Sequence, residues 1–370
     1  MSDGGRPLPA GFAEALIGWQ RRDGRHGLPW QGTRDPYRVW LSEIMLQQTQ
    51  VSTVLSYYPR FLDRFPDVSA LAAAAVDDVM ALWSGLGYYT RARNLLRCAQ
   101  DVVAKWDGQF PRTSADLATL PGIGASTAAA IAAFCFGERI SILDGNVRRV
   151  LTRLLAFDQD LAQAAPQRLL WDLAQGLVPT GPQGDDMAAY TQGLMDLGAT
   201  VCTRSRPACA LCPVNDLCEG RRAGDPTRFP VRTRKLARRF EAWWLLLVER
   251  PGQQGPGEVW LQKRPDRGIW AGLYCPPVFD SRDALCAAAG AGCAEQLQDG
   301  EAVAHALTHR ELRLHPLLVD VTDVPEFAVC EPAQALVRAT AEIAAIRSFV
   351  RSICGACDFN KVFDLTGPEP

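Results

Sequence analysis

Four cysteines gathered in one short segment constrain the fold of this chain more than any other feature. Their positions are separated by six, two and five residues: Cys202, Cys209, Cys212 and Cys218. Four thiolates on one loop can enclose a compact soft-metal centre, so the backbone must wrap around that centre. Structural zinc sites usually pair their ligands as two short knuckles, and here only the middle two cysteines form one. We therefore expect one [4Fe–4S] cluster, with zinc as the alternative and unliganded thiols as the weakest one.

The remaining composition fits an intracellular globular protein. A length of 370 residues suggests two or three domains. The first residues lack the basic start and apolar core of a signal peptide, and no apolar run approaches the ~20 residues of a membrane span. Scattered thiols and a cluster suit a reducing compartment. We expect a monomer without a membrane partner in the cytoplasm, associated with the nucleoid if the source is bacterial.

Charge is unevenly placed along the chain. The total is only −2, but residues 231–239 contain five basic residues and no acid. Residues 240–370 contain 11 basic and 18 acidic residues. The acidity therefore belongs to the last third, and the total says little about a local nucleic-acid-binding face.

The residue pattern predicts a helical first part and a mixed second part. Ala- and Leu-rich helical segments dominate residues 1–225, whereas strand-like runs begin near Ala242. We expect an all-α region, a basic linker over 226–240, and an α+β domain over 241–353. Further helices are expected at 281–298 and 331–353. The tail, 354–370, contains Cys354 and Cys357, a weak signal for a redox or metal pair.

Residues 113–133 predict a site for DNA phosphate. A helix N-cap at Thr113 or Ser114 precedes the turn Leu120-Pro-Gly-Ile-Gly124 and an Ala-rich helix. Because Gly122 and Gly124 lack Cβ, backbone amides at the helix start can approach a phosphate closely. An ordinary tight turn is the alternative, but the full pattern resembles a helix-hairpin-helix motif. Such a motif positions a protein on DNA without reading its sequence.

Asp144 follows the second hairpin glycine by twenty residues and precedes an amphipathic helix. Its position predicts an N-cap, which is compatible with presenting a carboxylate to a substrate. The hairpin followed by this Asp resembles the endonuclease III superfamily of DNA glycosylases, and so do the three cysteine gaps. The resemblance implies that Asp144 is catalytic. Members that cleave the DNA strand carry a Schiff-base lysine where this chain has Ser126.

The segment WLSEIMLQQTQV (40–51) carries a further resemblance. Two amides, Gln47 and Gln48, interrupt an apolar helical stripe, which suggests a helix break with Thr49 capping the next helix. Glu43 lies one turn before Gln47, and a solvated helix charge is its alternative role. The string resembles adenine DNA glycosylases of the MutY type. In that family the matching Glu is the catalytic acid, and the Gln-Gln-Thr turn enters DNA beside the oxidised guanine.

The same resemblance extends over about residues 12–350 and implies further contacts. Tyr88, in SGLGYYTRARNL, matches a tyrosine that wedges into the duplex, with core packing as the alternative. We assign DNA contacts to two glycines of the hairpin, Gly122 and Gly124. We assign further contacts to the wedge residue and to residues expected beside it: Tyr88, Leu46, Gln48, Thr49 and Arg91. Residues WLQKRPDRGIWAGLYCPP resemble a Nudix-like domain, without the acidic hydrolase box. Leu307, Thr308 and His309 match a Phe-Ser-His loop that recognises 8-oxoguanine, with Leu replacing Phe.

Together these features predict a monofunctional adenine DNA glycosylase acting on adenine mispaired with 8-oxoguanine or guanine in double-stranded DNA. Glu43 would protonate the base and Asp144 would stabilise the sugar cation. Ser126 and Asn146 would orient water and the carboxylates. Two alternatives remain: a glycosylase/lyase of the endonuclease III type, against which Ser126 argues, and a non-catalytic protein that binds 8-oxoguanine.

Overall fold

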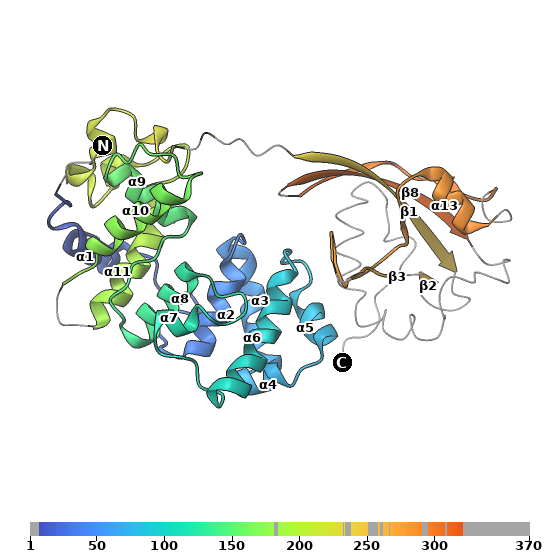
Figure 1. The fold of residues 1–370 in the computed structure, drawn as a ribbon, viewed down its shortest axis with the longest axis horizontal. Helices are drawn as coiled ribbons and strands as arrows, with labels where there is room; N and C mark the ends of the chain where they lie inside the picture. Colours follow the sequence, from blue (N-terminus) through green and yellow to red (C-terminus); the bar gives the residue numbers. More distant parts are fainter. Residues whose placement is uncertain are drawn as a thin grey trace. The chain divides into compact units, whose positions relative to one another are not determined.

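The computed structural model describes residues 7–180, 184–231, 233, 238–250, 258–259, 262–265, 267–290, 295–307 and 309–320. It divides into two compact units, Met1–Lys235 and Leu236–Pro370. The described residues of the first unit form helices and turns, and those of the second form a six-stranded sheet, a separate two-stranded sheet and one helix (Figure 1). The fold class, an all-α part followed by an α+β part, is confirmed. No described helix is long and apolar enough to cross a membrane.

The first unit is a succession of short helices. In chain order they are α1 (Phe12–Asp23), α2 (Pro36–Leu46), α3 (Val51–Arg64), α4 (Val68–Ala72), α5 (Val76–Trp83), α6 (Thr90–Trp106), α7 (Ser114–Leu117), α8 (Ala125–Ile131), the π-helical turn η1 (Ala132–Phe136), α9 (Gly145–Leu154), α10 (Ala164–Gly176), α11 (Gly184–Asp196), the π-helical turn η2 (Leu197–Val201), η3 (Cys209–Leu211), η4 (Asn215–Leu217), α12 (Glu219–Arg222) and η5 (Pro226–Arg228).

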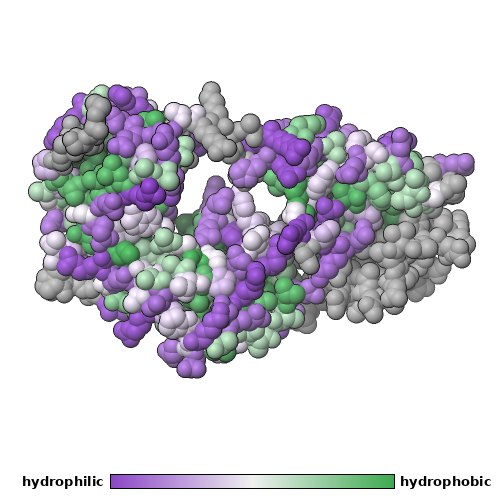
Figure 2. All heavy atoms as spheres, in the orientation of Figure 1, coloured by the Kyte–Doolittle hydropathy of each residue, from purple (hydrophilic) through white to green (hydrophobic). Residues whose placement is uncertain are grey.

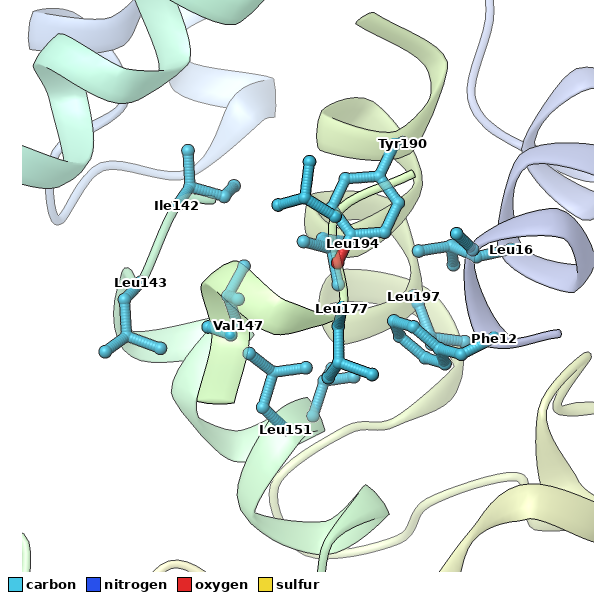
Figure 3. Close-up of a cluster of buried hydrophobic side chains, with 14 of the residues drawn as sticks. Phe12, Leu16, Ile142, Leu143, Val147, Leu151, Leu177, Tyr190, Leu194 and Leu197 are labelled. Atoms are coloured by element: carbon cyan, nitrogen blue, oxygen red, sulfur yellow. The ribbon is translucent and has the colours of Figure 1, made fainter. Parts of the chain in front are cut away.

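One hydrophobic core joins the first helix of this unit to its last long helices. Helix α1 packs against α11, and α9 contacts both α10 and α11. Figure 3 shows Val147 and Leu151 of α9 directed at the same cluster as Tyr190 and Leu194 of α11. The apolar face of α9 is thus buried, which fixes the helix and the position of its N-terminus.

Helices α2 to α6 pack mainly among themselves around fully buried aromatic side chains, among them Trp40, Trp83, Tyr58 and Phe61. Helix α2 contacts α3 and α6 on one side and α8 on the other. It therefore connects this group of helices to the core that contains α8 and α9.

The visible surface mixes hydrophilic residues with small hydrophobic patches (Figure 2), as expected for a surface that faces water.

The sheet of the second unit is built on two long parallel strands. Strand β1 (Arg239–Arg250) pairs with β8 (Arg310–Asp320) over eleven residues, from Arg239 with Arg310 to Glu249 with Asp320. Four shorter strands pair antiparallel with these two: β2 (Glu258–Val259) and β5 (Val278–Phe279) with β1, and β6 (Gln298–Asp299) and β7 (Val303–Ala306) with β8. Strands β3 (Gln262–Lys263) and β4 (Tyr274–Cys275) form a separate pair.

Both faces of the long strands are covered. Leu246 and Val248 of β1 pack with Leu285 of α13 (Arg282–Ala289) on one face. On the other face, Ile269 and Trp270 pack against the cluster that contains Trp243 and Leu245. This two-sided burial explains why the segment AWWLLLVER is nearly continuous in apolar residues rather than alternating.

One expected helix differs from the helix observed. The helix expected at 281–298 ends at Ala289, because Gly290 adopts a left-handed φ of 81° that terminates it. The apolar run before Leu86 forms two helices, α4 and α5, because Asp77 and Asp78 favour a new helix N-terminus there. The helix expected at 331–353 and the pair Cys354 and Cys357 lie outside the described residues.

Candidate active site and cluster loop

Two carboxyl groups from distant parts of the sequence lie within electrostatic reach of each other. Glu43 lies on α2, which contacts α8, and Asp144 precedes α9. Glu43 is partly buried, and burial first, then the charge of Asp144, raises the pKa of its carboxyl to about 8. A group with that pKa is mostly protonated at neutral pH, so Glu43 is equipped to donate a proton.

Asp144 is the N-cap of α9, as its position predicts. Its Oδ1 accepts hydrogen bonds from the backbone N–H groups of Asn146, at 2.6 Å, and Val147, at 2.9 Å. Both cap bonds use the same oxygen, so Oδ2 takes no part in the cap. The carboxylate is held at the positive end of the helix dipole while its second oxygen serves no capping function.

The side chains of Ser126 and Asn146 both lie next to this cap. Ser126, on α8, accepts a hydrogen bond through Oγ from the backbone N–H of Leu143, at 3.0 Å, which fixes the residue before Asp144. The Oδ1 of Asn146 accepts from Nη2 of Arg149, at 2.9 Å. The side chain of Ser126 therefore holds the segment before Asp144, and that of Asn146 is bonded to Arg149 on the same helix.

The hairpin turn has the geometry that its glycines predict. Thr113 caps α7, with its Oγ1 accepting from Asp116 N–H. Gly122 has a φ of 78°, and a Cβ there would lie 2.7 Å from Cβ of Asn94. Gly124, the N-cap of α8, is exposed and has no atom within 4 Å of a hypothetical Cβ. Gly122 is thus required by conformation and packing, and Gly124 leaves open space before the helix N-terminus.

A break follows α2, as the two glutamines predict. Gln47 ends the helix, and its Nε2 donates to Oγ1 of Thr127 on α8, at 3.3 Å. Gln48 is exposed and has a left-handed φ of 59°. The expectation that Thr49 caps the next helix is wrong, because the N-cap of α3 is Gln50 and makes no side-chain cap bond.

Tyr88 lies in a second left-handed turn, between α5 and α6, with a φ of 50° and 48% of its surface exposed. This exposure is at odds with a core-packing role. Arg91, expected to contact DNA, is instead only 8% exposed, and its guanidinium group donates to carbonyls at the end of α2 and in the Tyr88 turn. Leu46, the last residue of α2, is partly buried.

The cysteine loop packs on α9. Burial raises the pKa of the Cys212 thiol to about 11, against a lowering effect of the Val214 backbone and with smaller raising effects of the charges of Cys202, Cys218 and Cys209. Among the described residues, no group of three or more His, Cys, Asp or Glu side chains is arranged to hold a single metal ion. Four soft thiol donors on one loop nevertheless suit an iron–sulfur cluster by their chemistry.

Two arginines of α9 connect this loop to the helix that begins after Asp144. Arg149 donates through Nε to the carbonyl of Cys202, at 2.8 Å. Arg153 is buried and donates through Nη1 to Cys202 Sγ, at 3.3 Å, and to the carbonyl of Thr203, at 2.7 Å. The buried guanidinium group of Arg153 holds the loop backbone, and it would supply a charge-assisted hydrogen bond to a cysteine thiolate that held a cluster.

In the second unit, two of the predicted recognition residues, Leu307 and His309, lie between β7 and β8. Leu307 N–H donates to the carbonyl of Arg310, at 2.8 Å, and its side chain packs against the cluster that contains Trp243. His309 is exposed. Thr308 lies outside the described residues.

Comparisons with known proteins agree with this arrangement. Residues 41–175 match the HhH-GPD superfamily of base excision DNA repair proteins, 202–218 the iron–sulfur binding domain of endonuclease III, and 252–347 a NUDIX domain. An adenine DNA glycosylase of Buchnera aphidicola subsp. Baizongia pistaciae is 38% identical over 270 residues, which cover 72% of this chain and 74% of the relative.

The chain belongs to the adenine DNA glycosylase family. The human adenine DNA glycosylase is 36% identical over 313 residues, covering 71% of this chain and 56% of the relative. A solved thermostable thymine-DNA glycosylase matches with a TM-score of 0.51 and 27% identity, covering 57% of this chain and 95% of that one. As a member of the adenine DNA glycosylase family, the chain is a DNA N-glycosylase of base-excision repair that binds an iron–sulfur cluster.

Sequence reasoning missed one contact and two residues of this site. Gln47 connects α2 to α8, and Arg149 and Arg153 connect α9 to the cysteine loop. The spacing of the arginines was the available signal, because residues four apart lie on the same face of a helix. The bond from Gln47 to Thr127 joins residues 80 positions apart, which no local pattern reveals.

Proposed function

We propose that this chain is a monofunctional adenine DNA glycosylase, which hydrolyses the N-glycosidic bond of adenine opposite 8-oxoguanine or guanine in double-stranded DNA. The observation that carries the proposal is the pair formed by Glu43 and Asp144. Glu43 has a carboxyl pKa of about 8, raised by burial and by the charge of Asp144. An acid that is protonated near neutral pH, beside a second carboxyl group, is the arrangement that glycosidic hydrolysis requires.

The proposed reaction starts with extrusion of adenine from the base stack, at a cost of a few kcal/mol. Glu43 then protonates a ring nitrogen of the base, so adenine departs as a neutral molecule. The C1′–N bond breaks and leaves an oxocarbenium-like sugar. Asp144 stabilises that cation through its carboxylate, electrostatically or as a transient nucleophile, until water adds.

Other residues have supporting roles in this proposal. Gln48 and Tyr88, both exposed, fill the space that the extruded adenine leaves, with Leu46 and Thr49 beside them. The hairpin amides around Gly122 and Gly124 bind a phosphate of the DNA backbone. Ser126 and Asn146 hold the segment around Asp144. The turn of Leu307, Thr308 and His309 recognises 8-oxoguanine.

The absence of a lysine at position 126 supports the monofunctional assignment. A serine hydroxyl cannot form an imine with the sugar, so the strand stays intact after base removal. The cluster is proposed to be of the [4Fe–4S] type, held by the four cysteines, and the enzyme to act as a monomer. When bound, the cluster can exchange electrons, but glycosidic hydrolysis moves none, so its proposed role is to hold the cysteine loop in shape.

Single-turnover cleavage of a duplex with one adenine opposite 8-oxoguanine tests the proposal. The expected product is an abasic site at that adenine, seen as a strand break only after alkali. A break without alkali, together with an efficient adduct trapped by borohydride, would favour the glycosylase/lyase instead. Binding without any alkali-labile site would favour a non-catalytic binding protein.

Leu307→Phe tests the proposed recognition turn. An aromatic ring at this position adds stacking area against a base, worth about 1 kcal/mol. We expect the preference for adenine opposite 8-oxoguanine over adenine opposite guanine to rise several-fold, measured as the ratio of single-turnover rates at limiting enzyme. An unchanged ratio would remove Leu307 from the recognition of 8-oxoguanine.

A further inference from the structure

The guanidinium group of Arg91 is buried between two turns that lie far apart in sequence. Its Nη1 donates to the carbonyls of Ile44 and Met45, each at 2.9 Å. Both carbonyls belong to the last turn of α2, where the helix leaves its final carbonyl groups without intrahelical partners. A cation at this position also suits the negative end of the helix dipole. Arg91 thus caps the C-terminus of α2 from another helix.

The second terminal nitrogen of Arg91 donates hydrogen bonds both to the turn after α2 and to the turn before α6. Its Nη2 donates to Oγ1 of Thr49, at 3.1 Å, and to the carbonyls of Leu86 and Gly87, each at 3.0 Å. The guanidinium carbon lies 5.1 Å from the centre of the Trp83 ring and 5.6 Å from that of the Tyr88 ring. One planar group therefore holds the turn after α2 and the turn before α6 together.

Each of the two turns contains a non-glycine residue with a positive φ, a conformation that surrounding contacts must stabilise. Five described non-glycine residues have a positive φ, and Gln48 and Tyr88 are two of them. A left-handed conformation is unfavourable for residues with a Cβ, and it persists where surrounding contacts over-determine it. Gln48 lies directly before Thr49, an acceptor of Arg91, and Tyr88 lies directly after Gly87, another acceptor. The same side chain thus restrains both strained turns.

We propose that Arg91 is a positioning residue that holds Gln48 and Tyr88 in one fixed arrangement, so that the two side chains enter the base stack together. This inference rests on the proposed function, in which these residues fill the space left by the extruded adenine. It also replaces the expected contact between Arg91 and DNA, because the guanidinium group is buried and already donates to five acceptors.

A lysine cannot perform this role. The guanidinium group is planar and presents donors on separate nitrogens, whereas an ammonium group has one nitrogen with three donors. A single ammonium nitrogen cannot take the places of both Nη1, which bonds the carbonyls of α2, and Nη2, which bonds those of the Tyr88 turn. The role therefore depends on the shape of the arginine side chain and not on its charge alone, which separates positioning from a general electrostatic effect.

The test uses base extrusion as its readout. The full chain carries Glu43→Gln to prevent cleavage, and the target adenine is replaced by 2-aminopurine, whose fluorescence rises when it leaves the stack. Arg91→Lys and Arg91→Met are compared with Arg97→Lys and Arg97→Met, because Arg97 is an exposed arginine on the same helix. We expect both Arg91 variants to lose at least tenfold in the extrusion equilibrium, and both Arg97 variants to change it less than twofold.

Two further measurements separate positioning from unfolding. In the chain with an intact Glu43, Arg91→Lys should lower the single-turnover rate by about the same factor as extrusion, without shifting the pH at which the rate declines. Thr49→Val removes one acceptor of Arg91 and is expected to weaken extrusion less. If the two residues act as one unit, adding Thr49→Val to Arg91→Lys should cause little further loss.

The outcomes are distinguishable. Full extrusion by a folded Arg91→Lys variant would overturn the inference while leaving the proposed function intact. If Arg91→Met fails to fold, the decision falls to Arg91→Lys and Thr49→Val, and wild-type extrusion by both would equally overturn it. If the unsubstituted chain produces no alkali-labile site at adenine, the proposed function itself fails.

Discussion

The middle of α2 and the N-terminus of α9 each hold one carboxyl group of the proposed catalytic pair, in contrasting surroundings. Glu43 lies part way along a helix, where the backbone N–H groups are already used within the helix. Asp144 lies at a helix N-terminus, where two backbone N–H groups bind it. Burial and the neighbouring charge raise the pKa of Glu43 to about 8. The contrast teaches that burial and a neighbouring charge suit one carboxyl group to the proposed proton donation, whereas a helix N-terminus suits the other to the proposed charge stabilisation.

Among the substitutions of the two carboxyl groups, Glu43→Gln is expected to lower the single-turnover rate most. Glutamine keeps the shape of the side chain but has no proton to donate, so the single-turnover rate should fall by about 10²–10⁴-fold or more. DNA binding, measured by titration with the same duplex, should remain within a few-fold of wild type. A variant with normal turnover would show that another group protonates the base.

Asp144→Asn removes the charge while retaining a residue that caps helices well. We expect a rate loss of about 10²–10³-fold with little change in thermal unfolding. Asp144→Ala is the matched control, because it also removes the cap and should cost about 1 kcal/mol in stability. Equal stability losses in the two variants would indicate that the cap and the charge cannot be separated.

The pH dependence of the rate tests the pKa of Glu43 directly. Because the protonated form is the active acid, the rate should be level near pH 7 and fall about tenfold per pH unit above about 8. Asp144→Asn removes one of the two causes of the raised pKa, so its decline should begin at a lower pH. Single-turnover rates from pH 5.5 to 9.5 measure both, and a wild-type rate that stays level to pH 9.5 would contradict the assignment.

The smallest expected effect is on stability. A carboxyl pKa raised from 4.5 to about 8 means that the folded state holds a proton that the unfolded state releases. The contribution of Glu43 to stability is therefore complete below about pH 4.5 and is lost as the pH rises through about 8. Glu43→Gln lacks this loss and should be more stable at pH 8 by about 1–3 kcal/mol, with the difference vanishing near pH 4. Urea unfolding at the two pH values measures it.

Much of this site could be predicted because its signals are local. The cap at Asp144, the glycine at position 122 and the helix break at the two glutamines each follow from backbone rules that act over a few residues. The family resemblance supplied what local rules could not, namely that Glu43 and Asp144 belong to one site.

The failures concern contacts that only the folded chain creates. Thr49 was expected to cap α3, but its hydroxyl is used by Arg91, 42 residues away. Arg91 itself carries a charge that suggests DNA, yet carbonyls at the end of α2 and in the Tyr88 turn surround it. In both cases the residue type indicated that the side chain forms hydrogen bonds, but it did not identify the partner. Tertiary packing decides which group a polar side chain meets.

The parallel pairing of β1 and β8 has a consequence for shortened forms of this protein. Strand β1 begins at residue 239, whereas its eleven-residue partner ends at residue 320. A chain that stops between those points would retain a strongly apolar strand without its long neighbour, and an unpaired strand of that kind invites aggregation. Shortening before residue 239 removes the hazard, so a larger deletion should be better tolerated by the cell than a smaller one.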